Sequence, residues 1–199
     1  MYSQNAEEEI ILKYFNGKIG TYISIGENDG VTLSNVRKLS ELGWTGINVE
    51  PSPNAFKMLV ENTKQFKKVK NYNFALGETN GNVKFYDCET HLNKGDHGLL
   101  STMVESEKKR WTKEKFNEIE VKCFRWKTFL NRLSVKEFDF ISMDIEGMEV
   151  GLLKQMDLRA TSMLCIEYNG DIEKKKEIDR LMVGFNVIYT SPENLIYAR

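Results

Sequence analysis

The chain has 199 residues, 41% of them hydrophobic and 29% charged, and a formal net charge of -1. This composition is ordinary for a globular protein and provides no overall field that would attract nucleic acid or an anionic membrane. Three scattered cysteines predict reduced thiols rather than a disulfide framework, and no apolar run approaches the roughly 20 residues that cross a bilayer. We therefore expect one cytoplasmic domain over residues 1–199, beginning with a short helix at 6–15.

A strand–turn–helix–strand unit follows at Thr21–Pro51. An apolar strand ends at Gly26, a turn runs to Gly30, apolar side chains at helical spacing continue to Gly43, and a second strand ends at Glu50. This pattern is half of a nucleotide-binding α/β unit, in which a carboxylate at the end of the second strand can bind a ribose diol.

The turn between Gly26 and Gly30 indicates which cofactor fits. Its spacing is G-x-x-x-G rather than G-x-G-x-x-G, and Glu27 and Asp29 would lie beside a pyrophosphate. A dinucleotide is therefore disfavoured, and a positively charged adenosine cofactor without phosphates is favoured. S-adenosylmethionine is the clearest candidate, with Glu50 at its ribose hydroxyls. The alternative is a purely structural unit with a surface turn.

A third strand is expected beyond the next helix. Residues 69–76 predict a strand that ends at Ala75-Leu76-Gly77, where small Ala75 suits a contact with the cofactor's base. Asn80-Gly81 is a strong hairpin signal and predicts a returning strand at 82–87.

Residues 88–117 are the least regular part of the sequence. A long irregular insertion is often a lid or binding loop, so we expect this one on the side where an acceptor enters. The run Glu105–Lys115 predicts a solvated helix within it. His91 and His97 are each either a general base or a surface residue.

Two later strands end in polar residues. The apolar run Phe138–Met143 predicts a central strand buried on both faces, and it is followed by Asp144 and Glu146. The next strand along the chain ends at Glu167 and Asn169. Because ligands bind at the carboxyl ends of strands in open α/β sheets, we expect these side chains near the reacting group.

The remaining pattern completes an α/β fold. Strands are predicted at 118–124, 185–190 and 194–198, the last two as an antiparallel hairpin, and helices at 125–133 and 172–182. The alternation predicts a mostly parallel seven-stranded sheet with helices on both faces.

Five motifs together resemble those of the FkbM-type S-adenosylmethionine-dependent methyltransferases. They are Y-I-S-I-G-E-N-D-G, N-V-E-P, F-A-L-G, M-D-I-E-G-M-E and C-I-E-Y. The resemblance implies a class I methyltransferase (Rossmann-like) fold and O-methylation of a hydroxyl on a sugar or a related small molecule. It assigns cofactor contacts and motif acids to Gly26, Glu27, Asn28, Gly30, Glu50, Asp144, Glu146 and Glu149.

The chain departs from this family at Ser24, where the family usually carries an acid two residues before the glycine. An acid there often supports the methionine amino group. Glu27 or Asp29 is the expected substitute.

The remaining site assignments concern the acceptor and the cofactor's surroundings. We expect Asp144, Glu146 and His97 to act on the acceptor, and Pro51 and Ala75 to join the cofactor contacts.

Oxygen ligands at adjacent strand ends also make Mg²⁺ a candidate cofactor. Asp144, Glu167 and Asn169 resemble the divalent site of catechol-type O-methyltransferases, in which the metal acidifies a hydroxyl. The alternative is that Asp144 contacts the cofactor or acts as a base.

The favoured function is O-methyl transfer to a small-molecule or saccharide acceptor, with neither nucleic acid nor a membrane as partner. Two alternatives stay open. One is a nicotinamide-dependent oxidoreductase, which an NADH titration would reveal. The other is a catalytically weak module of the same fold, which would bind the cofactor without turnover.

Overall fold

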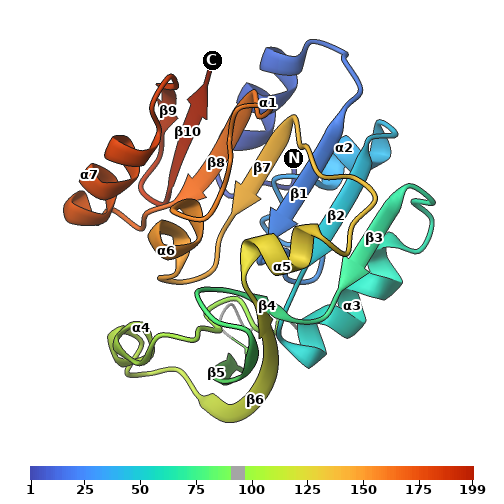
Figure 1. Cartoon of the computed structure of the whole chain (residues 1–199). Helices are drawn as coiled ribbons and strands as arrows, with labels where there is room; N and C mark the ends of the chain where they lie inside the picture. Colours follow the sequence, from blue (N-terminus) through green and yellow to red (C-terminus); the bar gives the residue numbers. More distant parts are fainter. Residues whose placement is uncertain (91–96) are drawn as a thin grey trace.

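The computed structural model describes residues 1–90 and 97–199, and its centre is a seven-stranded sheet (Figure 1). The strand order is β3-β2-β1-β7-β8-β10-β9, with β10 antiparallel to both of its neighbours and the other pairs parallel. This confirms the predicted mostly parallel sheet and its C-terminal hairpin. The strands are β1 Thr21–Ile25, β2 Thr45–Val49, β3 Val69–Tyr72, β7 Phe140–Met143, β8 Met163–Glu167, β9 Asn186–Thr190 and β10 Asn194–Ala198.

Two apolar clusters place helices against both faces of this sheet. On one face, Phe15 and Leu39 pack with Tyr22 of β1. On the other, Phe129 and Leu152 pack with a cluster that also contains the alternate side chains of β1. Central strands β7 and β8 are buried along their whole length, as a parallel strand covered on both faces requires. The helices are α1 Glu7–Phe15, α2 Arg37–Glu41, α3 Pro53–Thr63, α4 Glu105–Arg110, α5 Trp126–Leu130, α6 Glu149–Leu153 and α7 Ile172–Leu181.

The predicted third strand at 69–76 is wrong as one element, because the chain turns between Tyr72 and Ala75. The Phe74 ring packs edge-on against Phe129 at 5.1 Å between ring centroids, and Asn73 Nδ2 donates to the Glu50 carbonyl at 2.8 Å. Both contacts pull these residues out of the ladder. β4 Ala75–Leu76 therefore belongs to a second sheet.

The predicted hairpin at Asn80-Gly81 is wrong for the same reason. The second sheet has the order β4-β6-β5, so β5 pairs with β6 and not with the segment that precedes the turn. A short strand of two residues leaves β5 without a local partner, and the later strand supplies one. The strands concerned are β5 Gly81–Cys88 and β6 Phe116–Phe124.

Three expected helices are shorter than the sequence predicts: the one before Gly43, the one at 105–115 and the one at 125–133, now α2, α4 and α5. Before α2 the backbone is irregular, because Asp29 Oδ1 accepts from Val31 N and Thr32 N, and Ser34 Oγ accepts from Arg37 N at 2.9 Å. These side-chain bonds compete with helical ones.

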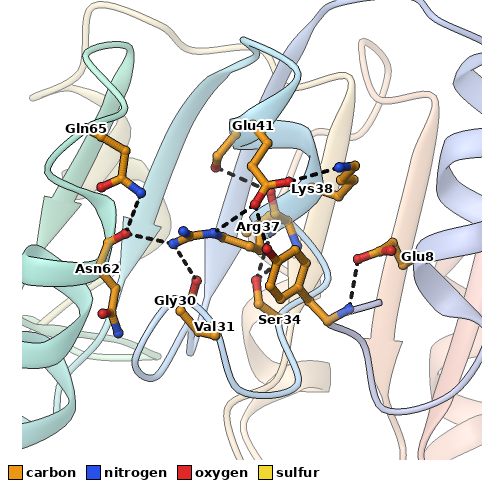
Figure 2. Close-up of polar contacts among 12 residues, drawn as sticks. Glu8, Gly30, Val31, Ser34, Arg37, Lys38, Glu41, Asn62 and Gln65 are labelled. Carbon is orange, nitrogen blue, oxygen red and sulfur yellow. Dashed lines mark hydrogen bonds and ion pairs between the residues drawn. The ribbon is translucent and has the colours of Figure 1, made fainter.

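Arg37 holds the irregular segment in place (Figure 2). Its Nη1 donates to the carbonyl of Asn62 at 2.7 Å and lies 3.5 Å from that of Gly30, while its Nε pairs with Glu41 at 3.5 Å. One guanidinium thus joins the loop, α2 and the end of α3.

Across the ranges 1–90 and 97–199, no helix has both the length and the apolar character needed to cross a membrane.

Candidate active site

A cavity of about 290 Å³ opens at the carboxyl ends of β1, β2, β7 and β8. Strand ends meet there because these strands are parallel neighbours (Figure 1). Most residues that the sequence predicts for the site line this one cavity. They are Gly26, Glu27, Asn28, Glu50, Pro51, Ala75, Asp144, Glu146, Glu167 and Asn169.

The two glycines of the first turn make close approaches to different parts of the chain. A Cβ on Gly26 would lie 1.6 Å from the Asp144 carbonyl oxygen, so the glycine allows two backbones to approach each other. Gly30 lies outside the cavity lining, and a Cβ there would lie 2.7 Å from Leu59 Cδ1 of α3. Both have positive φ, of +80° and +76°.

The Glu27 carboxyl group lies directly beside Ser24. Its Oε2 accepts from Ser24 Oγ at 2.5 Å and its Oε1 from Ser34 Oγ at 2.6 Å. Burial raises the pKa of Glu27 to about 7, although the two hydroxyl donors oppose the shift. Asp29 instead lies outside the lining and closes the loop, with its oxygens bonded to Val31 and Thr32.

Glu50 is buried and held in one orientation. Its Oε2 accepts from the backbone N–H of Asn28 at 2.8 Å and its Oε1 from that of Ser52 at 2.7 Å. Burial raises the pKa of Glu50 to about 8, while these bonds lower it. Each carboxylate oxygen keeps a second lone pair, so Glu50 can still accept hydroxyl donors from a ligand in the cavity.

A second group of acids surrounds the turn after β7. One carboxylate oxygen from each of Asp144, Glu146 and Glu167 lies within 4.8 Å of the others. Burial and then the charge of Asp144 raise the pKa of both Glu146 and Glu167. Asp144 is exposed into the cavity, yet enclosure by protein and the charge of Glu149 raise its pKa to about 7, against the effect of Lys174. Asp144 can therefore accept a proton near neutral pH.

Glu149 shapes this turn from below. It is fully buried and outside the lining, and its Oε1 accepts from the backbone N–H groups of Ile145 and Gly147. Lys174 Nζ on α7 pairs with its Oε2 at 2.7 Å. Of the three motif acids, this one orients the turn rather than facing a ligand.

Four residues of the cavity lining have left-handed backbone conformations although they are not glycines: Asn28, Leu33, Glu146 and Asn169, with φ of +53°, +57°, +49° and +52°. Asn28, Glu146 and Asn169 each follow a different strand. Such conformations are uncommon and tend to gather at functional sites, because the surrounding structure must hold them.

Of the two histidines, His97 alone lies in the described chain, and it is not part of this lining. His97 is half-buried, and its backbone carbonyl accepts from Asn28 Nδ2 at 2.7 Å, while its neighbour Gly98 lines the cavity. His91 lies outside the described residues. The role of His97 as a base stays a prediction without a cavity contact to support it.

Two parts of the cavity were not predicted from the sequence: one polar wall and most of the rim. Asn35 Nδ2 donates to Ser142 Oγ at 3.2 Å, and Asn35 Oδ1 has no hydrogen-bond partner among the described residues. The only signal for this wall was Ser142, a polar residue inside an apolar strand. The rim residues come from the predicted insertion and β5: Phe85, Leu99, Leu100, Met103, Arg110 and Trp111.

Comparisons with known proteins give a family match and a shared fold. The model of the methyltransferase FkbM domain matches residues 24–189. Among solved structures, a candidate caffeoyl-CoA O-methyltransferase from Staphylococcus aureus aligns with a TM-score of 0.57 at 9% identity, over 98% of this chain and 84% of its own. The precorrin-6y C5,15-methyltransferase from Geobacter metallireducens GS-15 aligns with a TM-score of 0.53 at 12% identity, over 96% and 86%. A candidate RNA methyltransferase, PH1948 from Pyrococcus horikoshii, gives 0.52 at 16%, over 98% and 84%.

These structural likenesses show the class I methyltransferase fold alone. No curated protein matches the sequence.

Proposed function

The chain belongs to the FkbM-domain methyltransferases, which use S-adenosylmethionine, and from that premise we propose that it methylates a hydroxyl oxygen of a sugar or a related small molecule. This membership disfavours a nicotinamide-dependent oxidoreductase. The methyl donor would occupy the part of the cavity formed by the turn after β1 and the end of β2, and the acceptor the part beside Asp144.

Three contacts support that placement of the cofactor. Glu50 presents free lone pairs to the ribose hydroxyls, and the buried carboxyl group of Glu27, whose pKa is raised to about 7, would ionise beside the methionine ammonium. Ala75, at the end of β4, leaves room for the base. Carboxylates at these positions repel phosphates, so the cavity suits a cationic donor without them.

The acceptor side provides a proton acceptor and an apolar rim. In the reaction, the acceptor oxygen forms a bond to the methyl carbon as the carbon–sulfur bond breaks, and the bonding pair stays on sulfur. Asp144 would take the hydroxyl proton, leaving a methyl ether and S-adenosylhomocysteine. Leu99, Leu100 and Met103 would pack against the body of the acceptor and help to exclude water.

One observation carries the proposal: the turn that holds Glu27 and the turn that holds Asp144 line the same cavity and touch through Gly26. A donor bound at the first turn therefore lies next to the acid group of the second, as in-line displacement requires.

The first test is calorimetric titration of the protein with S-adenosylhomocysteine. We expect saturable binding that Glu50→Ala weakens at least tenfold, because each lost charge-assisted hydrogen bond is worth roughly 1.5–3 kcal/mol. Glu61→Ala on the exposed side of α3 is the control and leaves binding unchanged; its side chain is 69% exposed. Equal affinity of wild type and Glu50→Ala would exclude the ribose assignment.

The second test is transfer of a labelled methyl group from S-adenosylmethionine to a panel of sugar, amine and thiol acceptors. We expect label on hydroxyl acceptors. Binding without transfer to any of them would favour the catalytically weak module.

A further inference from the structure

Three carboxylates from two strand ends converge at the acceptor side of the cavity. One oxygen from each of Asp144, Glu146 and Glu167 lies within 4.8 Å of the other two. A divalent cation binds oxygen at about 2.0–2.6 Å, so two ligands of one ion lie up to about 5 Å apart. The three oxygens can therefore surround one ion after sub-ångström adjustments.

Two of these acids are buried with an oxygen that has no partner. Glu146 is 6% exposed and Glu167 is 5% exposed, and the Oε2 of each accepts no hydrogen bond from the described part of the chain. Buried carboxylate oxygens normally accept hydrogen bonds or contact a cation. These two oxygens thus point to a ligand that the polypeptide does not supply.

The nearby cationic side chains are committed elsewhere. Lys174 Nζ lies 2.7 Å from Glu149 and only 3.9 Å from Glu167. Arg110, at the cavity rim, lies 2.6 Å from Glu107. Each of these two cations has a closer carboxylate partner outside the cluster, so neither fully neutralises the three acids when they ionise.

The backbone fixes the cluster before any ion arrives. Glu146 has φ of +49°, and its carbonyl accepts from Thr102 Oγ1 at 2.7 Å. The backbone N–H groups on either side of Glu146, from Ile145 and Gly147, are bonded to Glu149. A preorganised turn loses little entropy when it binds an ion.

We propose that Asp144, Glu146 and Glu167 bind one divalent cation of the hard, oxygen-preferring class, Mg²⁺ or Mn²⁺. The sequence predicted Asp144, Glu167 and Asn169 as ligands; Glu146 joins the first two in the structure, and Asn169 lines the same cavity. Water or an acceptor oxygen would complete the coordination. A metal lowers the pKa of a hydroxyl that it binds, so with the ion bound Asp144 would act as its ligand and the hydroxyl proton would pass to water instead. This use of the ion rests on the proposed methyl transfer, whereas binding of the ion does not.

The test uses Mn²⁺ alone as the probe, with the full chain freed of metal by a chelator. The amplitude of the paramagnetic resonance signal of free Mn²⁺ falls as the ion binds. We expect one equivalent to bind, excess Mg²⁺ to displace it, and Glu146→Gln and Glu167→Gln each to weaken binding at least tenfold. Glu193→Gln, which changes another carboxylate of the same cavity, is the matched control and keeps wild-type affinity.

Affinity for S-adenosylhomocysteine, measured on the same variants, shows that they are folded. If wild type leaves the Mn²⁺ signal unchanged, or if the two Gln variants bind Mn²⁺ as wild type does, the proposed metal site is overturned. If wild type binds S-adenosylhomocysteine in that case, the proposed methyltransferase function is unaffected. Mn²⁺ binding without S-adenosylhomocysteine binding would support the metal site and contradict the proposed methyltransferase function.

Discussion

The turns after β1 and β7 are alike in position, but the acidic side chains around them differ in how many hydrogen bonds they accept. Both lie at the carboxyl end of a central strand, and each contains a non-glycine residue with positive φ, Asn28 or Glu146. Beside the first turn, both oxygens of Glu27 and of Glu50, which follows β2, accept hydrogen bonds from the protein. Beside the second, Glu146 and Glu167, the last residue of β8, each keep a buried oxygen that accepts no hydrogen bond from the described residues.

This difference shows two ways of preparing a binding site. At the first turn, the carboxyl oxygens already accept hydrogen bonds without a ligand. A ligand therefore adds donors to groups that are already oriented. The second turn gathers carboxylates that repel one another, so it gains stability from any cation that enters. Three substitutions test this contrast, and they follow in order of expected effect.

Lys174→Met removes the buried cation beneath the second turn and gives the largest effect. Lys174 is 13% exposed and pairs with fully buried Glu149 at 2.7 Å. Loss of one partner from a buried pair costs about 3–5 kcal/mol, and we expect urea unfolding to show a loss of that size. The control is Lys175→Met on the same helix, whose pair with Asp179 is solvent-exposed and contributes about 0.5 kcal/mol. Similar losses from both variants would contradict the role of Lys174.

Gly26→Ala disturbs the contact between the two turns. The new Cβ would overlap the Asp144 carbonyl, and φ of +80° is unfavourable for alanine. We expect a loss of about 2–4 kcal/mol by urea unfolding, from overpacking and backbone strain together. Gly43→Ala is the control, because it has φ of +88° but open space around its Cα, and it isolates the backbone cost of about 1 kcal/mol. If the two variants lose equal stability, the turns do not depend on this contact.

Glu27→Gln tests the first turn through the pH dependence of stability, and we expect the smallest change in stability from it. The pKa of Glu27 rises from 4.5 to about 7 in the fold, so the folded state holds a proton that the unfolded state has released. The stability from this group is complete below about pH 4.5 and is lost as pH rises to about 7, with a slope of up to about 1.4 kcal/mol per pH unit.

The glutamine keeps hydrogen bonds to Ser24 and Ser34, whose hydroxyls can reverse direction, but it cannot ionise. We therefore expect the free energy of unfolding, measured with urea, to fall less between pH 5 and pH 7 in the variant than in wild type. Parallel pH profiles for the two proteins would exclude ionisation of Glu27.

The central sheet could be predicted from the sequence because the hydrophobic pattern determines which residues form its buried strands. The unbroken apolar run that becomes β7 is a local signal, and it appears in the structure as predicted. The carboxyl ends of the strands then had to share one edge, which brought Glu50, Asp144 and Glu167 to one cavity.

The parts that sequence reasoning missed depend on contacts between distant residues. The division at Phe74 follows from its packing with Phe124 and Phe129, about 50 residues away. No local pattern shows that Gly26 approaches the backbone of Asp144. Long-range packing overrides strand propensity at such positions.

The insertion between β5 and β6 has a consequence for how this protein can change. It is bonded to both turns: its His97 carbonyl accepts from Asn28 Nδ2, and its Thr102 Oγ1 donates to the Glu146 carbonyl. The side chains of Leu99, Leu100 and Met103 belong to the rim of the cavity. Substitutions at those three rim positions can therefore diversify the range of accepted molecules without moving the reactive groups. A library for directed evolution of new acceptor specificity is best confined to them.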